Sequence, residues 1–424
     1  MERLCIPLAI ILLSLIGALA QPQPPYTAAD IEDLGEDVAD DLIEHYYTNG
    51  YTALEVIAFL IARHGIIRSL RQVRRIIQRR HIRRRDVRSA AADVVNAIRV
   101  ELRGSGQNLG YRSMWRRLRT RHNIYATQDD VRELLTLLDV EGVQRRSTRR
   151  LRRRQYVSVG PNHVIHVDGY DKLKPYGFAV HGAIDGFSRK VLWLRVGYSN
   201  NDPRFVARFY LNFVRNINGV PRIVRCDRGT ENCLIRDIQI ALRWDHNDCF
   251  DRHRSFRYGR STSNQRIESW WGHLGRLSSR YWIELFKHLR DVGEFDNSNP
   301  VHIEAIRLCF QRLIQRDFDR TVQEWNQHCI RSQNNEELPY GVPDLMYHVP
   351  EMFGTEDQKM PLMYSAQELE DTSRAVSLDY PVYGCSQEFV DAVNAHVGNL
   401  DNFELPDSVE DALDLYEHLV NLFL

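Results

Sequence analysis

Apolar residues recur at helical spacing in the first third of the chain and predict a series of short helices. Residues 27–48 and 52–62 form the first two, and a turn that contains Gly65 leads to a third helix capped by Ser69. Two short helices around a glycine turn, the second of them basic, are typical of a helix-turn-helix unit. A plain helical hairpin with an exposed basic side is the alternative, but DNA recognition is the favoured interpretation.

A second helical unit follows. Its three predicted helices begin near Val94, Gly110 and Thr127, and each has one apolar face. The Arg-rich run at 145–154 then indicates a flexible basic linker, since arginine forks match phosphate oxygens.

Charge is distributed unevenly, although the chain has 56 Lys and Arg against 56 Asp and Glu. Residues 63–154 contain 26 Arg, no Lys and 8 acids, whereas residues 351–424 contain 16 acids against Lys359 and Arg374. A segment this basic indicates a polyanionic partner, and the helix-turn-helix pattern favours double-stranded DNA. The candidate DNA contacts are arginines of the basic helices and the linker: Arg71, Arg74, Arg75, Arg79, Arg112, Arg116, Arg150 and Arg153.

At residue 164 the pattern changes from helical spacing to short β-branched segments. The predicted strands are 164–167, 178–184, 191–196 and 222–226. A hairpin turn at 186–188 joins the second strand to the third, a helix begins at Asp202-Pro203, and a long helix is predicted for 264–289. A strand meander followed by alternating helix and strand indicates an α/β fold, with a mixed sheet flanked by helices.

Three carboxylates lie at informative places in these elements. Asp168 ends the first strand in HVDGYDKL, Asp227 ends a later strand in VRCDRGTEN, and Glu268 lies in the first turns of the long helix in SNQRIESWW. Strand ends and helix starts converge at one edge of a sheet, where a carboxylate has room for a divalent cation. Phosphoryl transfer on DNA uses such cations, because two Mg²⁺ ions about 3.5–4 Å apart activate the nucleophilic oxygen and stabilise the leaving oxygen. Mg²⁺ prefers oxygen ligands.

The segment from about 160 to 282 resembles the integrase core shared by retroviral integrases and DDE transposases. The segment AIDGFSRKV (183–191) resembles that family's second-strand hairpin, and the loop GRSTSNQ (259–265) directly precedes the helix with the Glu. The resemblance implies an RNase H-like fold, a catalytic and metal-binding triad, and Mg²⁺ or Mn²⁺ as the cofactor. That triad is Asp168, Asp227 and Glu268.

The same resemblance implies an activity. It is that of a DDE-type polynucleotidyl transferase, an integrase or transposase that catalyses strand transfer during DNA integration, works as a homo-oligomer and takes no small-molecule substrate. The two helical units before the core resemble the DNA-binding front of transposon-derived cellular integrase-like proteins. Two departures from the retroviral pattern stand out: Asp227 and Glu268 are 41 positions apart, with an insertion around 243–257, and a zinc-binding His/Cys front is absent from the sequence.

Two other functions also fit the sequence. The first is a domesticated, transposon-derived DNA-binding protein without catalytic activity, in which the core serves for assembly. The second is an RNase H-like nuclease that acts on RNA. The helix-turn-helix front argues against the nuclease, because the deep, narrow major groove of A-form RNA does not admit a reading helix.

Several residues near the triad have structural roles as their expected function. Asp185 is expected to order the hairpin turn, Asn264 to cap the long helix, and Trp271 to pack in the core. The 243–257 insertion is interpreted as polar surface rather than a zinc site, since a fourth ligand is lacking beside its three candidate ligands. Those candidates are His246, Cys249 and His253.

The ends of the chain are harder to reconcile with a DNA-handling protein. Residues 1–20 have the form of a secretory signal or membrane anchor, whereas the function predicts a nuclear location, and a misassigned start would resolve the conflict. Seven cysteines without a CxxC pair indicate reduced thiols.

The expected domains are a signal-like or misassigned segment (1–25), a helix-turn-helix region (27–85), a second helical DNA-binding unit with its Arg-rich linker (86–155), an RNase H-like catalytic core (156–330) and a loosely packed acidic tail (331–424).

Overall fold

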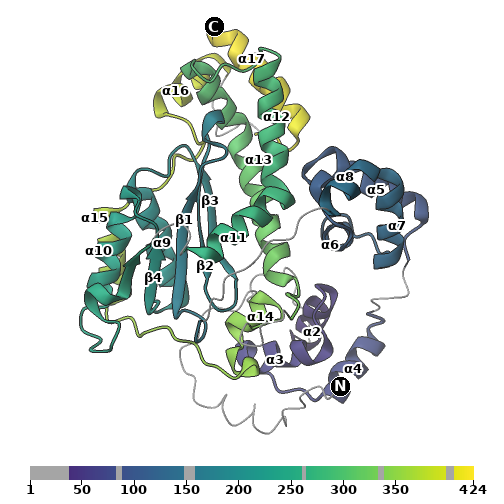
Figure 1. The fold of residues 1–424 in the computed structure, drawn as a ribbon, viewed down its shortest axis with the longest axis vertical. Helices are drawn as coiled ribbons and strands as arrows, with labels where there is room; N and C mark the ends of the chain where they lie inside the picture. The colour runs from purple at the N-terminus through teal and green to yellow at the C-terminus, as the bar shows by residue number, and fades with distance from the viewer. Residues whose placement is uncertain (1–37, 83–87, 148–157, 260–263, 333–338, 398–404) are drawn as a thin grey trace.

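The structure is a computed structural model that describes residues 38–82, 88–147, 158–259, 264–332, 339–397 and 405–424. At its centre a five-stranded mixed sheet has the order β3-β2-β1-β4-β5 (Figure 1). The strands are β1 (Val164–Tyr170), β2 (Ala179–Asp185), β3 (Val191–Gly197), β4 (Ile223–Cys226) and β5 (Phe256–Tyr258). The predicted α/β, RNase H-like fold with all-α units before it is confirmed.

Strand β1 is the centre of the sheet and sets the positions of two of the predicted acids. It pairs antiparallel with β2 and parallel with β4, and the parallel register aligns Val164 with Ile223 and His166 with Arg225. Asp168 lies two residues after His166, and Asp227, directly after the end of β4, lies two residues after Arg225. Because the side-chain period of a strand is two, this alternation directs both acids toward the same side of the sheet.

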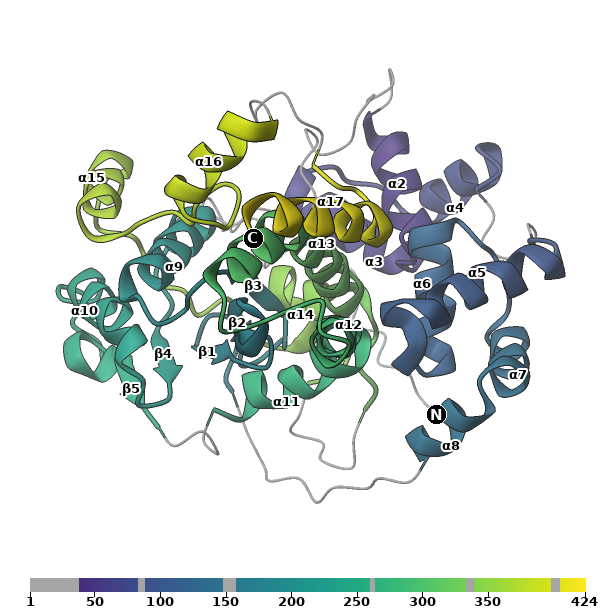
Figure 2. The ribbon, with the colours of Figure 1, turned by 90° about the horizontal axis from the view of Figure 1, so that it is seen from above.

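Helices cover both faces of the sheet (Figures 1 and 2). One face packs against α9 (Pro203–Ile217), α10 (Cys233–Leu242) and α15 (Ala366–Val376). The other packs against α11 (Gln265–Leu274), α12 (Arg280–Asp291), α13 (Pro300–Gln327), α16 (Gln387–Val397) and α17 (Val409–Phe423). The start of α9 is as predicted, with Asp202 as the N-cap and Pro203 in the first turn.

The first helical unit consists of α2 (Val38–Thr48), α3 (Ala53–His64) and α4 (Leu70–Arg79). Ser69 caps α4 in a capping box with Gln72, as its position predicts. Gly65 ends α3 with a φ of 64°, a left-handed conformation that glycine adopts at little cost. The apolar core of this unit also contains residues from the C-terminal part of the chain, around α14 (Pro343–His348).

The second helical unit has an apolar core of its own. It contains α5 (Ala91–Arg103), α6 (Tyr111–His122) and α7 (Gln128–Leu138), followed by α8 (Val140–Ser147). Thr127 caps α7 in a capping box with Asp130. A short 3-10 turn, Ser105–Asn108, joins α5 to α6, and outside this unit such turns occupy Lys174–Tyr176, Thr230–Asn232, Arg252–Ser255 and Pro350–Phe353.

The prediction of a loosely packed C-terminal tail is wrong for the residues that the structure describes. Leu369 of α15 is buried against the α9 face of the sheet, and Ala412, Tyr416 and Leu419 of α17 are buried in the core with α13. Each of these acidic helices has one apolar face, which the average composition hides. Just before α17, Asp407 pairs with Arg312 and Arg316 of α13.

The helix predicted for 264–289 is interrupted. It consists of α11, a π-turn at Gly275–Ser279 (η8) and α12. Neither α10 nor β5 was predicted from the sequence, and the three residues of β5 lie at the end of the predicted insertion.

The expectations about a membrane anchor and about reduced cysteines can be compared with the described residues only. Across the described ranges, every helix falls short of the length and apolarity required to cross a bilayer, and residues 1–20 lie outside those ranges. The six cysteines in the described part of the chain are free thiols, and Cys226, Cys309 and Cys385 are buried.

Candidate active site

The three predicted acids come from three elements that meet on the α11 side of the sheet. Asp168 lies within β1, Asp227 directly follows β4, and Glu268 lies in the first turn of α11. The charges of Asp227 and Glu268 both raise the pKa of Asp168, and the charge of Asp227 also raises the pKa of Glu268. Residues far apart in the sequence thus form one electrostatic site.

Asp168 is the most buried of the three acids. Burial is the main cause that raises its pKa to about 7, and the two neighbouring acids act in the same direction. The indole Nε1 of Trp271 donates a hydrogen bond of 2.8 Å to Oδ2 of Asp168 and opposes this shift. Trp271 and Glu268 lie on the same helix, α11, so this hydrogen bond connects that helix to one carboxylate oxygen of Asp168.

The donor set fits a hard divalent cation. Oδ1 of Asp227 is buried without a hydrogen-bond partner, and a carboxylate oxygen in that position is stabilised by a cation. As their side chains stand, however, no three His, Cys, Asp or Glu residues in the described ranges are grouped tightly enough to hold a metal ion. The triad is therefore a set of electrostatic neighbours rather than a closed ligand cluster, as expected when mutual repulsion is not offset by positive charge.

Asn264 has a different role from the predicted one. Its side chain makes no capping hydrogen bond to α11. Instead its Nδ2 donates to the carbonyl of Val167 at 2.9 Å, and its Oδ1 lies 2.7 Å from Nδ1 of His166. The fully buried His166 has its pKa lowered to about 3 by burial, so a neutral ring donates from Nδ1 to Asn264. Asn264 thereby fixes the start of α11 to the two residues that precede Asp168.

Two other local predictions can be compared with the contacts. Asp185 orders the β2–β3 turn as expected, since its Oδ2 accepts from the backbone of Phe187 and from both the backbone and hydroxyl of Ser188. Trp271 is buried as predicted, and so is Trp270. The sequence analysis missed the contact of Trp271 with Asp168. Its signal was the spacing of three positions between Glu268 and Trp271, which puts both on one side of the helix.

The predicted DNA-contacting arginines lie in different surroundings. Arg71, Arg74 and Arg75 are exposed on α4, where they line an open hollow with Leu70 and Gln78. Of the remaining candidates, Arg79 pairs with Asp40, Arg112 is exposed on α6, and Arg150 and Arg153 lie outside the described residues.

Arg116, also predicted to contact DNA, is used inside the chain. It donates to the carbonyl of Glu324 in α13 at 3.4 Å, and burial lowers its pKa. The arginine-rich sequence of α6 suggested contact with nucleic acid, but Arg116 instead connects the second helical unit to the core.

In the 243–257 segment, one of the three candidate zinc ligands, His246, forms a hydrogen bond with the carbonyl of Pro361.

Comparison with known proteins identifies a family for the central part of the chain. Residues 155–342 match the family described as "Integrase core domain". No curated protein sequence matches the chain. Among solved structures, the simian T-cell lymphotropic virus intasome in complex with PP2A regulatory subunit B56 gamma matches over 63% of this chain and 78% of that chain, at 14% identity and a TM-score of 0.30. The family match and the sheet order together show that residues 155–342 form an integrase core domain.

Proposed function

We propose that the protein is a DDE-type polynucleotidyl transferase, an integrase or transposase that joins DNA strands in the presence of Mg²⁺ or Mn²⁺. The observation that carries the proposal is the convergence of Asp168, Asp227 and Glu268 from β1, the end of β4 and α11, close enough for the charges of Asp227 and Glu268 to raise the pKa of Asp168. Two structural ties support it: Trp271 and Asn264 both join α11 to β1 beside Asp168.

The three acids are the residues that would hold the metal. Bound divalent ions supply the activation of a nucleophilic oxygen and the stabilisation of a leaving oxygen. The chain's own contribution is positional: the indole of Trp271 occupies Oδ2 of Asp168, while the partnerless Oδ1 of Asp227 is available to a ligand. Double-stranded DNA is the proposed partner, with the exposed arginines of α4 as the first contacts. Those arginines are Arg71, Arg74 and Arg75.

A strand-transfer assay on the full chain tests this function. Purified protein is incubated with duplex DNA ends, a target plasmid and Mg²⁺ or Mn²⁺, and joined products are counted. Asp168→Asn and Glu268→Gln should abolish joining while duplex DNA binding persists. Asp291→Asn, which changes an exposed acid at the end of α12, should behave as wild type. Equal product from wild type and Asp168→Asn would refute the enzymatic proposal.

One observation favours a second candidate, a domesticated DNA-binding protein without catalytic activity. As the side chains of the described residues stand, the triad does not form a closed metal-ligand group. This candidate predicts tight, salt-dependent binding of duplex DNA together with no metal-dependent joining by wild type. The same assay, run beside a binding measurement, therefore separates the two functions.

We further propose self-association and a nuclear location. An enzyme that joins two DNA ends to a target needs more than one copy to hold them. Sedimentation analysis of the full chain with and without duplex ends tests the oligomer, and imaging of chains with and without residues 1–20 tests the location.

A further inference from the structure

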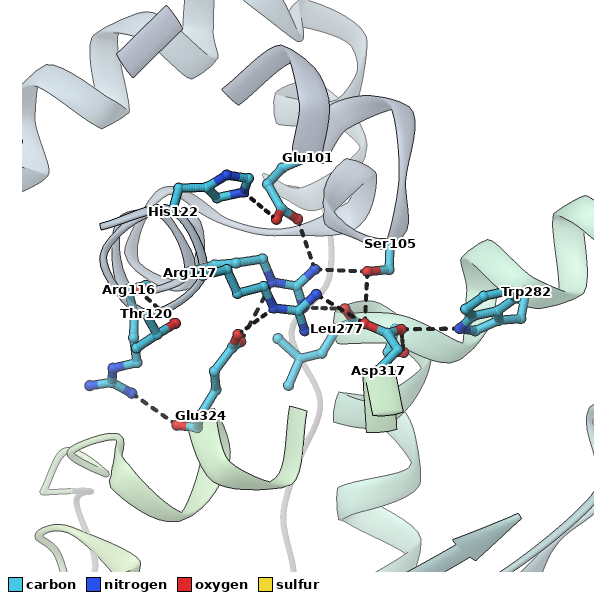
Figure 3. A network of polar contacts seen from close by, with 12 residues as sticks. Glu101, Ser105, Arg116, Arg117, Thr120, His122, Leu277, Trp282, Asp317 and Glu324 are labelled. Atoms are coloured by element: carbon cyan, nitrogen blue, oxygen red, sulfur yellow. Dashed lines mark hydrogen bonds and ion pairs between the residues drawn. The ribbon is translucent and has the colours of Figure 1, made fainter. Parts of the chain in front are cut away.

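A buried network of charged groups joins the second helical unit to the integrase core (Figure 3). Its centre is Arg117 of α6, whose side chain is 0% exposed. Within its own unit, Arg117 donates to Glu101 at 3.1 Å and to Ser105 at 2.9 Å. Across the boundary it donates to the backbone carbonyl of Leu277 at 2.7 Å. Arginine is ordinarily a surface residue, but Arg117 is buried and donates hydrogen bonds both within its own unit and to the core.

Acids from the core complete the junction. Glu324 of α13 lies 3.5 Å from Nε of Arg117 and 2.9 Å from Nε of Arg121. Asp317, also on α13, accepts from Arg121 at 3.0 Å. Buried charges that are paired and hydrogen-bonded in this way resist separation, because loss of one partner leaves the others uncompensated. The second unit is thus fixed to the core rather than loosely tethered.

The core segment that Arg117 reaches is the π-turn between α11 and α12. A π-turn inserts an extra residue into a helix and often occurs at functional sites. This turn is held by three different elements: Arg117 binds the carbonyl of Leu277, Asp317 accepts from the hydroxyl of Ser278, and Tyr170 bonds Ser279 at 2.7 Å.

The π-turn therefore connects the helix and the strand that carry the acids. Glu268 lies on α11, which leads directly into the turn, and Tyr170 lies on β1 two residues after Asp168. A shift of the turn would move the C-terminal end of α11 relative to β1. The hydrogen bond from Trp271 to Asp168 also joins α11 to β1.

We propose that Arg117 is a positioning residue of the integrase core: by holding the π-turn from the second helical unit, it sets the placement of α11, and with it Glu268, against β1. This inference rests on the proposed function for its effect on catalysis. Its structural part, the dependence of α11 on Arg117, stands independently of whether the enzyme is active.

The chain offers a matched control on the same helix. Arg116 neighbours Arg117 and also reaches the core, but its hydrogen bond goes to the carbonyl of Glu324 in α13 rather than to the π-turn. Full-length Arg117→Gln and Arg116→Gln are compared by hydrogen exchange of residues 264–279, by the Mg²⁺ concentration that half-saturates thermal stabilisation, and by strand transfer.

The Arg117→Gln variant should exchange faster in residues 264–279 and need on the order of tenfold more Mg²⁺, the loss typical when a partner that orients a metal ligand is removed. Its strand-transfer kcat should fall while the KM for DNA stays unchanged, since the α4 surface is intact. Arg116→Gln, which loses a contact to α13 but none to the π-turn, should match wild type in the exchange of residues 264–279 and in the Mg²⁺ requirement. A purely structural junction would instead lower global stability and leave the Mg²⁺ requirement unaltered.

Should Arg117→Gln fail to fold, Tyr170→Phe tests the same turn from the β1 side by removing only the hydroxyl that bonds Ser279. It should raise the Mg²⁺ requirement and the exchange of 264–279 in the same direction. The proposal is overturned if the folded variant equals Arg116→Gln in exchange and in Mg²⁺ requirement. If wild type joins no DNA, the proposed function fails, whereas the exchange and Mg²⁺ measurements still decide the role of Arg117.

Discussion

The indole Nε1 of Trp271 and the Oδ2 of Asp168 form a 2.8 Å hydrogen bond that ties α11 to β1 inside the candidate site. One residue earlier, the indole nitrogen of Trp270 is buried without a partner. Of these two adjacent tryptophans, Trp271 donates a hydrogen bond to a candidate metal ligand and Trp270 does not.

This difference gives a matched pair of substitutions. Trp271→Phe keeps an aromatic ring in the core but removes the donor to Asp168, so it should reduce strand transfer and Mg²⁺ affinity by about tenfold or more. Trp270→Phe removes a nitrogen that makes no hydrogen bond and should change both far less. Mg²⁺ titration followed by thermal unfolding, together with the joining assay, measures the effect. Equal Mg²⁺ affinity in the two variants would show that the Trp271 contact has no part in the site.

Asn264 should be important for stability as well as for the site. Asn264→Ala removes the donor to the carbonyl of Val167 and the acceptor of His166 Nδ1, so two buried polar groups each lose a hydrogen bond. The expected loss is about 1–3 kcal/mol for each such group. Urea unfolding of Asn264→Ala against Asn201→Ala, a change at an exposed position, measures it. A cap at α11 would predict only about 1 kcal/mol, so a small loss would restore the capping interpretation.

The junction of the second helical unit predicts a particular dependence on pH. Burial of Glu101 raises its pKa, but the hydrogen bond from His122 and the charges of Arg117 and Arg121 outweigh it and lower the pKa to about 2. Since the folded pKa lies below the unfolded value of 4.5, the stabilisation from Glu101 is complete above pH 4.5 and is lost as the pH falls toward 2.

Comparison of wild type with Glu101→Gln isolates this contribution from the other carboxylates. The difference in unfolding free energy should be constant from pH 7 to about 4.5 and shrink below it. Urea unfolding at a series of pH values measures the difference. A difference that stays level down to pH 2, or one that grows, would contradict the ionised form of Glu101 at the junction.

Features of the fold that depend on residues close together in the sequence are predictable from it, whereas features that depend on distant residues are not. Helix starts at Ser69, Thr127 and Asp202 follow from capping within a few residues, and the first three strands follow from local β-branched runs. The α10–β5 segment is different: a three-residue strand, Phe256–Tyr258, has too short a pattern to detect and exists because β4 offers it a parallel partner.

The candidate site shows the same division. The order and local context of Asp168, Asp227 and Glu268 resemble those of the integrase core, and this resemblance predicts the triad. Asn264 was assigned to a cap because its local position allows one, whereas its actual partners are almost a hundred positions away in the sequence. The role of Arg117 is not predictable from its own helix either, because nothing in α6 indicates the acid of α13 that it contacts.

The exposed arginines of α4 should provide much of the affinity for duplex DNA. Replacing Arg71, Arg74 and Arg75 together with Gln should weaken binding and make its dependence on salt shallower by about one unit of log–log slope for each phosphate that is no longer neutralised. The effect is electrostatic, so it should be similar for unrelated duplex sequences. Fluorescence anisotropy with a labelled duplex across a range of salt concentrations measures both the affinity and the slope.

Arg79→Gln is the control, because Arg79 lies on the same helix but already pairs with the buried Asp40 of α2. Its substitution should affect folding stability more than the salt slope. If the triple variant binds with wild-type affinity and slope and Arg79→Gln does so too, the DNA surface is not the exposed face of α4. The basic charge that contacts DNA must then belong to another part of the Arg-rich segment between residues 63 and 154.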